Sequence, residues 1–207
     1  MIDWLKNHFP PGSNYLVAQD NVEQLNAYLF NEFVSTRNSG RKQSLWGESA
    51  QKLSSLGEKI GWVPNRFFAA FLSNTVEEEI AEAFAASQKL LQFDSTHLEL
   101  SRCLLTHFDL LFLAERNPHL LSEGEAKLIW FLTQWAKQPL FLIIGYLPVS
   151  LSKKWIDDAV FFLKQSAGNE NKNITIILGY LPFQIDWLND LLNDQKWVNI
   201  QKMPNRE

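Results

Sequence analysis

Residues 140–148 read Leu-Phe-Leu-Ile-Ile-Gly-Tyr-Leu-Pro, and residues 174–182 read Ile-Thr-Ile-Ile-Leu-Gly-Tyr-Leu-Pro. In each segment a short apolar run precedes Gly-Tyr-Leu-Pro, which predicts a buried strand that ends before the glycine. In open parallel sheets ligands bind beyond the carboxyl ends of the strands, which is where both Gly-Tyr-Leu-Pro segments are expected. The repeat is therefore either the edge of a ligand site or a pair of turns in which Gly and Pro end the strands.

Amphipathic helical patterns alternate with apolar runs along the last third of the chain. Helices are predicted at residues 123–137, 151–165 and 183–192, and strands at residues 140–144, 174–178 and 197–200. Strands that alternate with helices are typical of a parallel sheet covered by helices on both faces. Residues 15–18 and 60–64 predict two further short strands, the second of which ends at Pro64.

The middle of the chain, from Thr75 to about residue 112, has a helical pattern. Thr75 is a suitable N-cap, and the three glutamates at residues 77–79 follow in the first turn, where acidic side chains are favoured. With Glu82 they predict a solvent-exposed helix face. We therefore expect a single domain over residues 1–207, in which a helical subdomain at about residues 75–135 interrupts the α/β part.

The composition excludes several classes of function. The chain has 207 residues and a net charge of -4, with no block of Lys or Arg longer than a pair, so we expect no binding to nucleic acid. The N-terminus lacks the pattern of a signal peptide, and no apolar run approaches the roughly 20 residues of a membrane span. The single cysteine, Cys103, is followed by two leucines and is predicted to be a buried thiol in a reducing compartment.

The histidines do not have the spacing of metal ligands, and the chain has no second thiol. They are His8, His97, His107 and His119. His97 and His107, with the nearby Asp94 and Asp109, are one way to assemble an acid and a base. Because these residues lie among apolar neighbours in the helical middle, we expect surface or hydrogen-bonded histidines there, and no metal site.

Residues 118–125 read Pro-His-Leu-Leu-Ser-Glu-Gly-Glu, which resembles the signature segment PHQLSGGE of ABC ATPases. Further segments fall where this family has its other motifs: residues 15–33 on the Walker A strand, loop and helix, 59–65 on the Q-loop, 74–80 on the start of the helical subdomain, 141–144 on the Walker B strand, 149–152 on the D-loop and 174–178 on the strand of the switch histidine. The resemblance covers nearly the whole chain from about residue 14. It implies an α/β fold of the P-loop NTPase type, with a mostly parallel sheet covered by helices and a helical subdomain in the middle.

The segment that matches Walker A lacks the residues that bind phosphate in the family. A P-loop needs glycines for close backbone approach, a lysine for the phosphates and a hydroxyl for Mg²⁺. Here Gln24 takes the place of the lysine and Leu25 that of the hydroxyl. The loop has no glycine, and its two acids would repel a phosphate. Its residues include Ala18, Asp20, Asn21 and Glu23. We therefore expect no nucleotide in the usual pose.

The other catalytic positions to which the resemblance points are also replaced. The Walker B Asp and Glu correspond to Gly145 and Tyr146, and the D-loop Asp corresponds to Ser152. Asn65 stands in place of the Q-loop glutamine, and the switch histidine falls on Gly179, or on Tyr180 if the register is shifted by one residue. Phosphoryl transfer depends on positioned charge, which these residues do not supply. The resemblance therefore implies a pseudo-ATPase with no catalytic residues and no bound cofactor.

The signature-like segment keeps part of the family's pattern. Ser122 and Gly124 match it, whereas Glu123 replaces a glycine and adds a negative charge. In an ABC dimer this segment of one subunit reaches the ATP of the other, so the resemblance implies that Ser122 and Gly124 can cap a partner's nucleotide. The alternative is a helix N-terminus in which Ser122 and Glu125 form a capping box.

Three phenylalanines, Phe67, Phe68 and Phe71, follow the Q-loop-like segment. The resemblance places them near the groove that receives a coupling helix of the permease. They are either part of the core or, if exposed, the anchors of that groove.

These replacements predict a non-hydrolysing ABC ATPase-like subunit that works through protein–protein contacts in a transporter-type complex. The expected partners are an ABC ATPase subunit, a membrane permease or both, in a homo- or heterodimer, without direct insertion into the membrane. The expected location is the cytoplasm, including the inner face of the cell membrane when a permease is bound. Two alternatives stay open: a subunit that binds ATP and Mg²⁺ weakly or in an atypical way, and a free-standing scaffold or adaptor that reuses the fold.

Overall fold

A computed structural model of the protein describes residues 5–7, 9–10, 13–18, 23–24, 27, 59–64, 71–145, 155, 157–159, 161–163, 174–180, 188, 193 and 197–200. Its centre is a five-stranded sheet in which every neighbouring pair of strands is parallel. The strands are β1 (Asn14–Ala18), β2 (Ile60–Val63), β3 (Phe141–Ile144), β4 (Thr175–Tyr180) and β5 (Trp197–Ile200). The predicted α/β class and the parallel sheet are confirmed.

The strands lie in the order β2-β3-β4-β1-β5, and the chain leaves the two neighbours β1 and β4 in opposite directions. From β1 it crosses to β2 at one edge, and from β4 it continues to β5 on the far side of β1. Ala18 at the end of β1 pairs with Tyr180 at the end of β4. Open α/β sheets bind ligands beyond the carboxyl ends of the strands at such a reversal, so the ends of β1 and β4 are the expected position of a site.

The two faces of the sheet bury alternate residues, because successive side chains of a strand point to opposite faces. Leu16 and Leu142 belong to the larger core, whereas Val17 and Ile143 belong to a smaller core on the other face, together with Leu5 near the N-terminus. Since both faces are covered, the strands consist of nearly continuous apolar runs and not of alternating apolar and polar residues.

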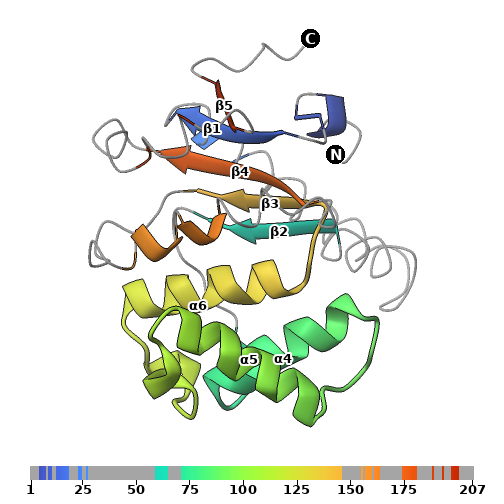
Figure 1. The fold of residues 1–207 in the computed structure, drawn as a ribbon, viewed down its shortest axis with the longest axis vertical. Coiled ribbons are helices and arrows are strands. Elements are labelled where there is room, and N and C mark those ends of the chain that lie inside the picture. Colours follow the sequence, from blue (N-terminus) through green and yellow to red (C-terminus); the bar gives the residue numbers. More distant parts are fainter. Residues whose placement is uncertain are drawn as a thin grey trace, which may run out of the picture.

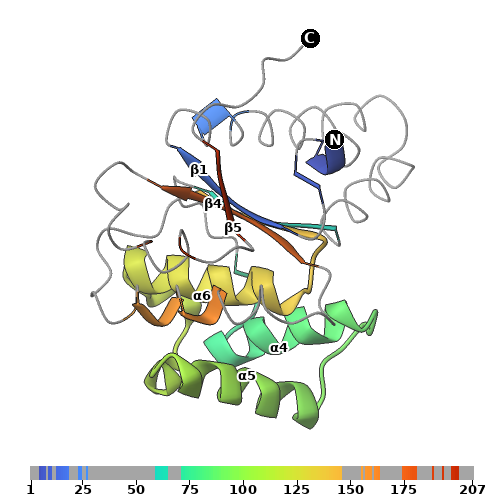
Figure 2. The same cartoon turned by 45° about the horizontal axis from the view of Figure 1, so that its top comes forward.

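Three described helices lie between β2 and β3 in the sequence: α4 (Val76–Ser87), α5 (Ser95–His107) and α6 (Glu123–Ala136). α6 packs against β2 and β3, and α4 and α5 form an outer layer in which α4 contacts α6 (Figure 1). The N-terminal helical residues 5–7 lie on the opposite side of the sheet from α6 (Figure 2). Two short 3-10 helices, η2 (Leu111–Leu113) and η3 (Pro118–Leu120), connect α5 to α6.

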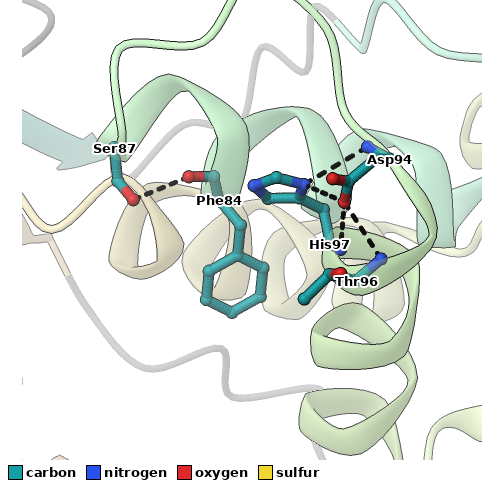
Figure 3. A network of polar contacts seen from close by, with 5 residues as sticks. All are labelled: Phe84, Ser87, Asp94, Thr96 and His97. Carbon is teal, nitrogen blue, oxygen red and sulfur yellow. Dashed lines mark hydrogen bonds and ion pairs between the residues drawn. The ribbon is translucent and has the colours of Figure 1, made fainter.

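Each of these three helices begins at a polar side chain that binds the backbone of the first turn. Thr75, Asp94 and Ser122 are the N-caps, and each forms a capping box with the residue three positions later, which confirms the N-cap predicted at Thr75. In α5 that residue is the buried His97, whose Nδ1 lies 2.6 Å from Asp94 Oδ1 (Figure 3). His97 is therefore a hydrogen-bonded helix-cap residue, as expected.

Side chains of α6 cover the outer edge of β2, which is the first strand of the sheet. The N–H of Trp62 donates to Gln134 Oε1 at 3.4 Å, and its C=O accepts a hydrogen bond from Trp130 Nε1 at 2.9 Å. The glycine before Trp62 permits this close approach. A Cβ on Gly61 would lie 2.9 Å from Pro139 Cγ and 3.2 Å from Gln134 O, so a larger residue would force α6 away from the sheet.

Two predictions for the helical middle are wrong. Glu77 and Glu79 are buried, so α4 does not present its glutamates as one solvated face, although Glu82 is exposed as predicted. Glu77 pairs with Arg102 of α5, whose Nε lies 2.7 Å from Glu77 Oε2, and the sequence does not reveal this pair because the two residues are 25 positions apart. Cys103 is exposed instead of buried, since its side chain lies outside the packed face of α5.

Candidate functional site

The carboxyl ends of β1, β3 and β4 lie at one edge of the sheet, where the family resemblance places the vestigial nucleotide site. β3 is followed directly by Gly145, which is buried and donates its N–H to Val63 O at 2.7 Å. β4 continues to Tyr180, so Gly179 and Tyr180 lie within the strand and do not follow it as predicted. The strand is longer because these two residues pair with the last two residues of β1. The described strand ends at this edge carry no carboxylate and no amine.

Other predicted positions of the nucleotide site lie outside the described residues. They are Asp20, Asn21, Leu25, Asn65, Tyr146 and Ser152. Of those that are described, Ala18 is the half-buried last residue of β1, and Glu23 and Gln24 are exposed in a helical segment that follows it. Among the described residues, no group of acids, histidines or cysteines is placed to hold a metal ion, and no helix is long and apolar enough to cross a membrane.

The signature-like segment lies at the start of α6, on the side of the molecule where the strands end (Figure 1). The N–H of Ser122 donates to Glu125 Oε2 at 2.9 Å, and Ser122 Oγ lies 2.6 Å from the same oxygen. These hydrogen bonds, that of the side chain first, lower the pKa of Glu125. The capping box is thus the local geometry of this segment. Ser122 and Glu123 are exposed, and Gly124 is half-buried.

Of the three phenylalanines predicted to lie in the core or in a partner groove, Phe67 and Phe68 are outside the described residues. Phe71 lies in the core, with 4% of its surface exposed. Its ring makes edge contacts with the rings of His119 and Trp130. Phe71 is therefore not an exposed anchor of a partner groove, because later parts of the chain fold over it.

Two leucines that the sequence reasoning missed are exposed beside this buried aromatic cluster. Leu72 is 87% exposed and Leu120 is 82% exposed. They lie on adjacent segments, because the aromatic residues that precede them in the sequence are in contact. Glu79 fixes the first segment: its Oε2 accepts the N–H of Leu72 at 2.8 Å and that of Ser73 at 3.0 Å. No periodic pattern marks either leucine, since both lie outside regular helices or at their ends.

Neither a protein-family model nor a curated protein matches the sequence. Solved structures of ATP-binding cassettes do match the fold. The ATP-binding cassette MJ0796, in a dimeric post-hydrolysis state bound to ADP and Pi, has a TM-score of 0.60 at 13% identity over 92% of this chain and 82% of that chain. An ATP-binding subunit of an ABC transporter has a TM-score of 0.58 at 12% identity over 92% of this chain and 75% of that chain.

A third similar structure is cbiO1 from Clostridium perfringens, described as part of the ABC transporter complex cbiONQ. Its TM-score is 0.55 at 16% identity, over 84% of this chain and 69% of that chain. At such low identity the likeness concerns the fold alone, and it agrees with the parallel sheet and the helices described above. The chain therefore has the fold of an ABC transporter ATP-binding domain, an α/β fold of the P-loop NTPase type.

Proposed function

We propose that this chain is a non-hydrolysing ABC ATPase-like subunit that acts through protein–protein contacts in an ABC transporter-type complex. The observation that carries the proposal is the glycine that follows β3. At the corresponding positions the family has an Asp that binds Mg²⁺ and a Glu that orients the attacking water. Gly145 has no side chain to offer, and its N–H is already bound to Val63 O. Gly145 can take neither role, which supports a subunit that keeps the fold without hydrolysing ATP.

The charges at this edge of the sheet also favour a subunit that does not hydrolyse ATP. Tyr180, the last residue of β4, lies beside Ala18 and is buried, and its phenol supplies no positive charge at this edge. Gln24 stands where the family has its lysine, directly after the acidic Glu23. A triphosphate needs positive charge and backbone N–H groups around it. The described residues of this edge supply no such cation, so they do not favour the alternative of weak or atypical ATP binding.

The contact surface of the proposed subunit includes Leu72 and Leu120. Apolar side chains that are more than 80% exposed on adjacent segments are typical of a surface that another protein covers. Glu79 holds the Leu72 segment in place through two hydrogen bonds, so this surface is formed before a partner binds. We assign to it an ABC ATPase subunit or a membrane permease as the partner, which would place the chain at the inner face of the cell membrane.

The absence of ATP turnover is tested on the purified full chain. We expect no heat of binding when Mg-ATP is titrated in a calorimeter, and no phosphate release above the buffer control. An intact ATP-binding cassette, treated in parallel, is the positive control for both measurements. Saturable binding with turnover would exclude a pseudo-ATPase, and saturable binding without turnover would support the atypical ATP-binding subunit instead.

The partner is tested by native co-purification from the cells that encode the chain. We expect an ABC ATPase subunit or a permease to be recovered with the wild-type chain. The double substitution Leu72→Ser and Leu120→Ser should lose it, whereas Leu91→Ser, at another fully exposed leucine, should keep it. Retention by the double variant would exclude the two leucines as the contact, and recovery of neither class of protein would contradict a transporter-type complex.

A further inference from the structure

A hollow of about 400 Å³ opens beside η2 in the outer layer of the molecule. It is lined by Arg102, Leu111, Phe112, Ala114 and Glu115. Ala114 is buried, whereas Phe112 is 57% exposed and Leu111 is nearly half exposed. A hollow of this size accepts a bulky apolar side chain, and an exposed aromatic residue beside it is the kind of side chain that anchors protein interfaces.

The charged residues around the hollow differ in whether they are already paired. Arg102 donates from Nε to Glu77 Oε2 at 2.7 Å and from Nη2 to Glu77 Oε1 at 3.3 Å, so its charge is compensated. Glu115 and Arg116 are both exposed, and neither forms an ion pair within the described part of the chain. The guanidinium carbon of Arg116 lies 5.8 Å from the centroid of the Phe112 ring. An anion in the lining of the hollow and a cation beside the Phe112 ring therefore occupy adjacent positions, and neither forms an ion pair in the described part of the chain.

We propose that two copies of this chain associate through this surface, the η2 face, which consists of Leu111, Phe112, Glu115, Arg116 and the hollow. Phe112 of each copy packs into the hollow of the other copy. Arg116 of each copy pairs with Glu115 of the other, beside the packed aromatic ring. A two-fold interface requires a surface that is complementary to itself, and here an apolar anchor with its hollow and a cation with its anion occur in one patch.

The balance of charge favours a second copy over an unrelated partner. A surface that recognises an acidic or a basic protein presents mainly one sign of charge, because complementary potentials give such interfaces their specificity. Apart from Arg102, whose charge Glu77 compensates, the η2 face presents one anion and one cation at adjacent positions. The inference does not rest on the proposed function, since the η2 face shares no residue with the strand ends or with Leu72 and Leu120, and it requires neither nucleotide nor permease.

The test is a charge exchange followed by analytical ultracentrifugation of the full chain over a range of concentrations. We expect the wild-type chain to dimerise reversibly. Glu115→Arg and Arg116→Glu should each raise the dissociation constant at least about tenfold, because each brings like charges together at two places in a two-fold dimer. The double variant with both substitutions should recover the wild-type dissociation constant, since both pairs form again with reversed signs.

An apolar pair of variants completes the test. Phe112→Ser should weaken the dimer at least about tenfold, and Leu91→Ser, at a fully exposed leucine outside the η2 face, should leave it unchanged. Circular dichroism and thermal unfolding of every variant distinguish a lost contact from a lost fold. The inference is overturned if the wild-type chain is monomeric, if single charge reversals leave the dimer intact, or if the folded double variant does not recover it.

Discussion

Among single residues, Lys127 shows most directly how a buried charge makes the stability of this fold depend on pH. Only 6% of its surface is exposed, and burial lowers its pKa to about 8, although the negative charge of Glu123 acts in the opposite direction. The folded chain holds this proton less tightly than the unfolded chain, so stability rises from about pH 8 towards the ordinary lysine pKa of 10.5. Below pH 8 the amine is charged in both states, and the full cost of burying it, roughly 3 kcal/mol for this shift, is present.

A neutral side chain of similar length should remove that cost. We expect Lys127→Met to raise the free energy of unfolding at pH 7 by roughly 1–3 kcal/mol and to flatten its rise between pH 8 and pH 10. Urea unfolding at pH 7, 8 and 10 measures both effects. Lys6→Met, at an exposed position, serves as the control and should leave the pH profile unchanged. A loss of stability at pH 7 would show that the contacts of the amine outweigh its desolvation.

At the level of helices and loops, the helix starts were predictable from the sequence and the buried acids were not. Thr75 and Ser122 each bind a residue three positions later, so a local pattern contains both partners. Glu79 binds the backbone of the segment that precedes α4. In the sequence, an acidic first turn that is buried has the same pattern as one that is exposed to solvent. The burial of Phe71 depends on Trp130, which is far along the chain. Side chains whose partners are distant in sequence therefore escaped prediction.

The hydrogen bonds of Glu79 lead to a prediction for the stability of α4. Glu79→Ala should lower the free energy of unfolding by roughly 1–3 kcal/mol, because the N–H groups of Leu72 and Ser73 lose their acceptor. Glu82→Ala removes an exposed glutamate from the same helix and should change the free energy by less than about 0.5 kcal/mol. Urea unfolding of both variants gives the comparison. Equal effects of the two substitutions would mean that the carboxylate of Glu79 contributes little.

For the molecule as a whole, the sequence predicts which segments form the sheet and that the strands are parallel, but not which strands are neighbours. The strand order places Ala18 of β1 beside Tyr180 of β4. β3, which Gly145 follows, lies on the other side of β4. Apolar runs can pair in several orders, and the rules for connections reduce the number of these orders without selecting one of them. The candidate site was therefore assigned by the family resemblance, and no pattern in the sequence indicates that Gly61 sets the distance between the sheet and α6.

Gly61 leads to a prediction for the contact between the two layers. Gly61→Ala should destabilise the fold by roughly 1–3 kcal/mol, because its Cβ would overlap with Pro139 and approach the backbone of α6. Val198→Thr, at a partly exposed position of β5, is a control for substitution within a strand and should have little effect. Thermal unfolding followed by circular dichroism measures both. A Gly61→Ala variant as stable as the wild type would show that α6 shifts without cost.

Trp130 and Gln134 also decide where this sheet can recruit a further strand. An extended peptide joins a sheet by bonding to the main-chain groups of its outermost strand. On β2 the outward N–H and C=O of Trp62 are already taken by the amide of Gln134 and the indole of Trp130. A foreign strand would find neither donor nor acceptor at the middle of β2, so this side of the molecule is protected from β-augmentation and from the edge-to-edge stacking that starts aggregation.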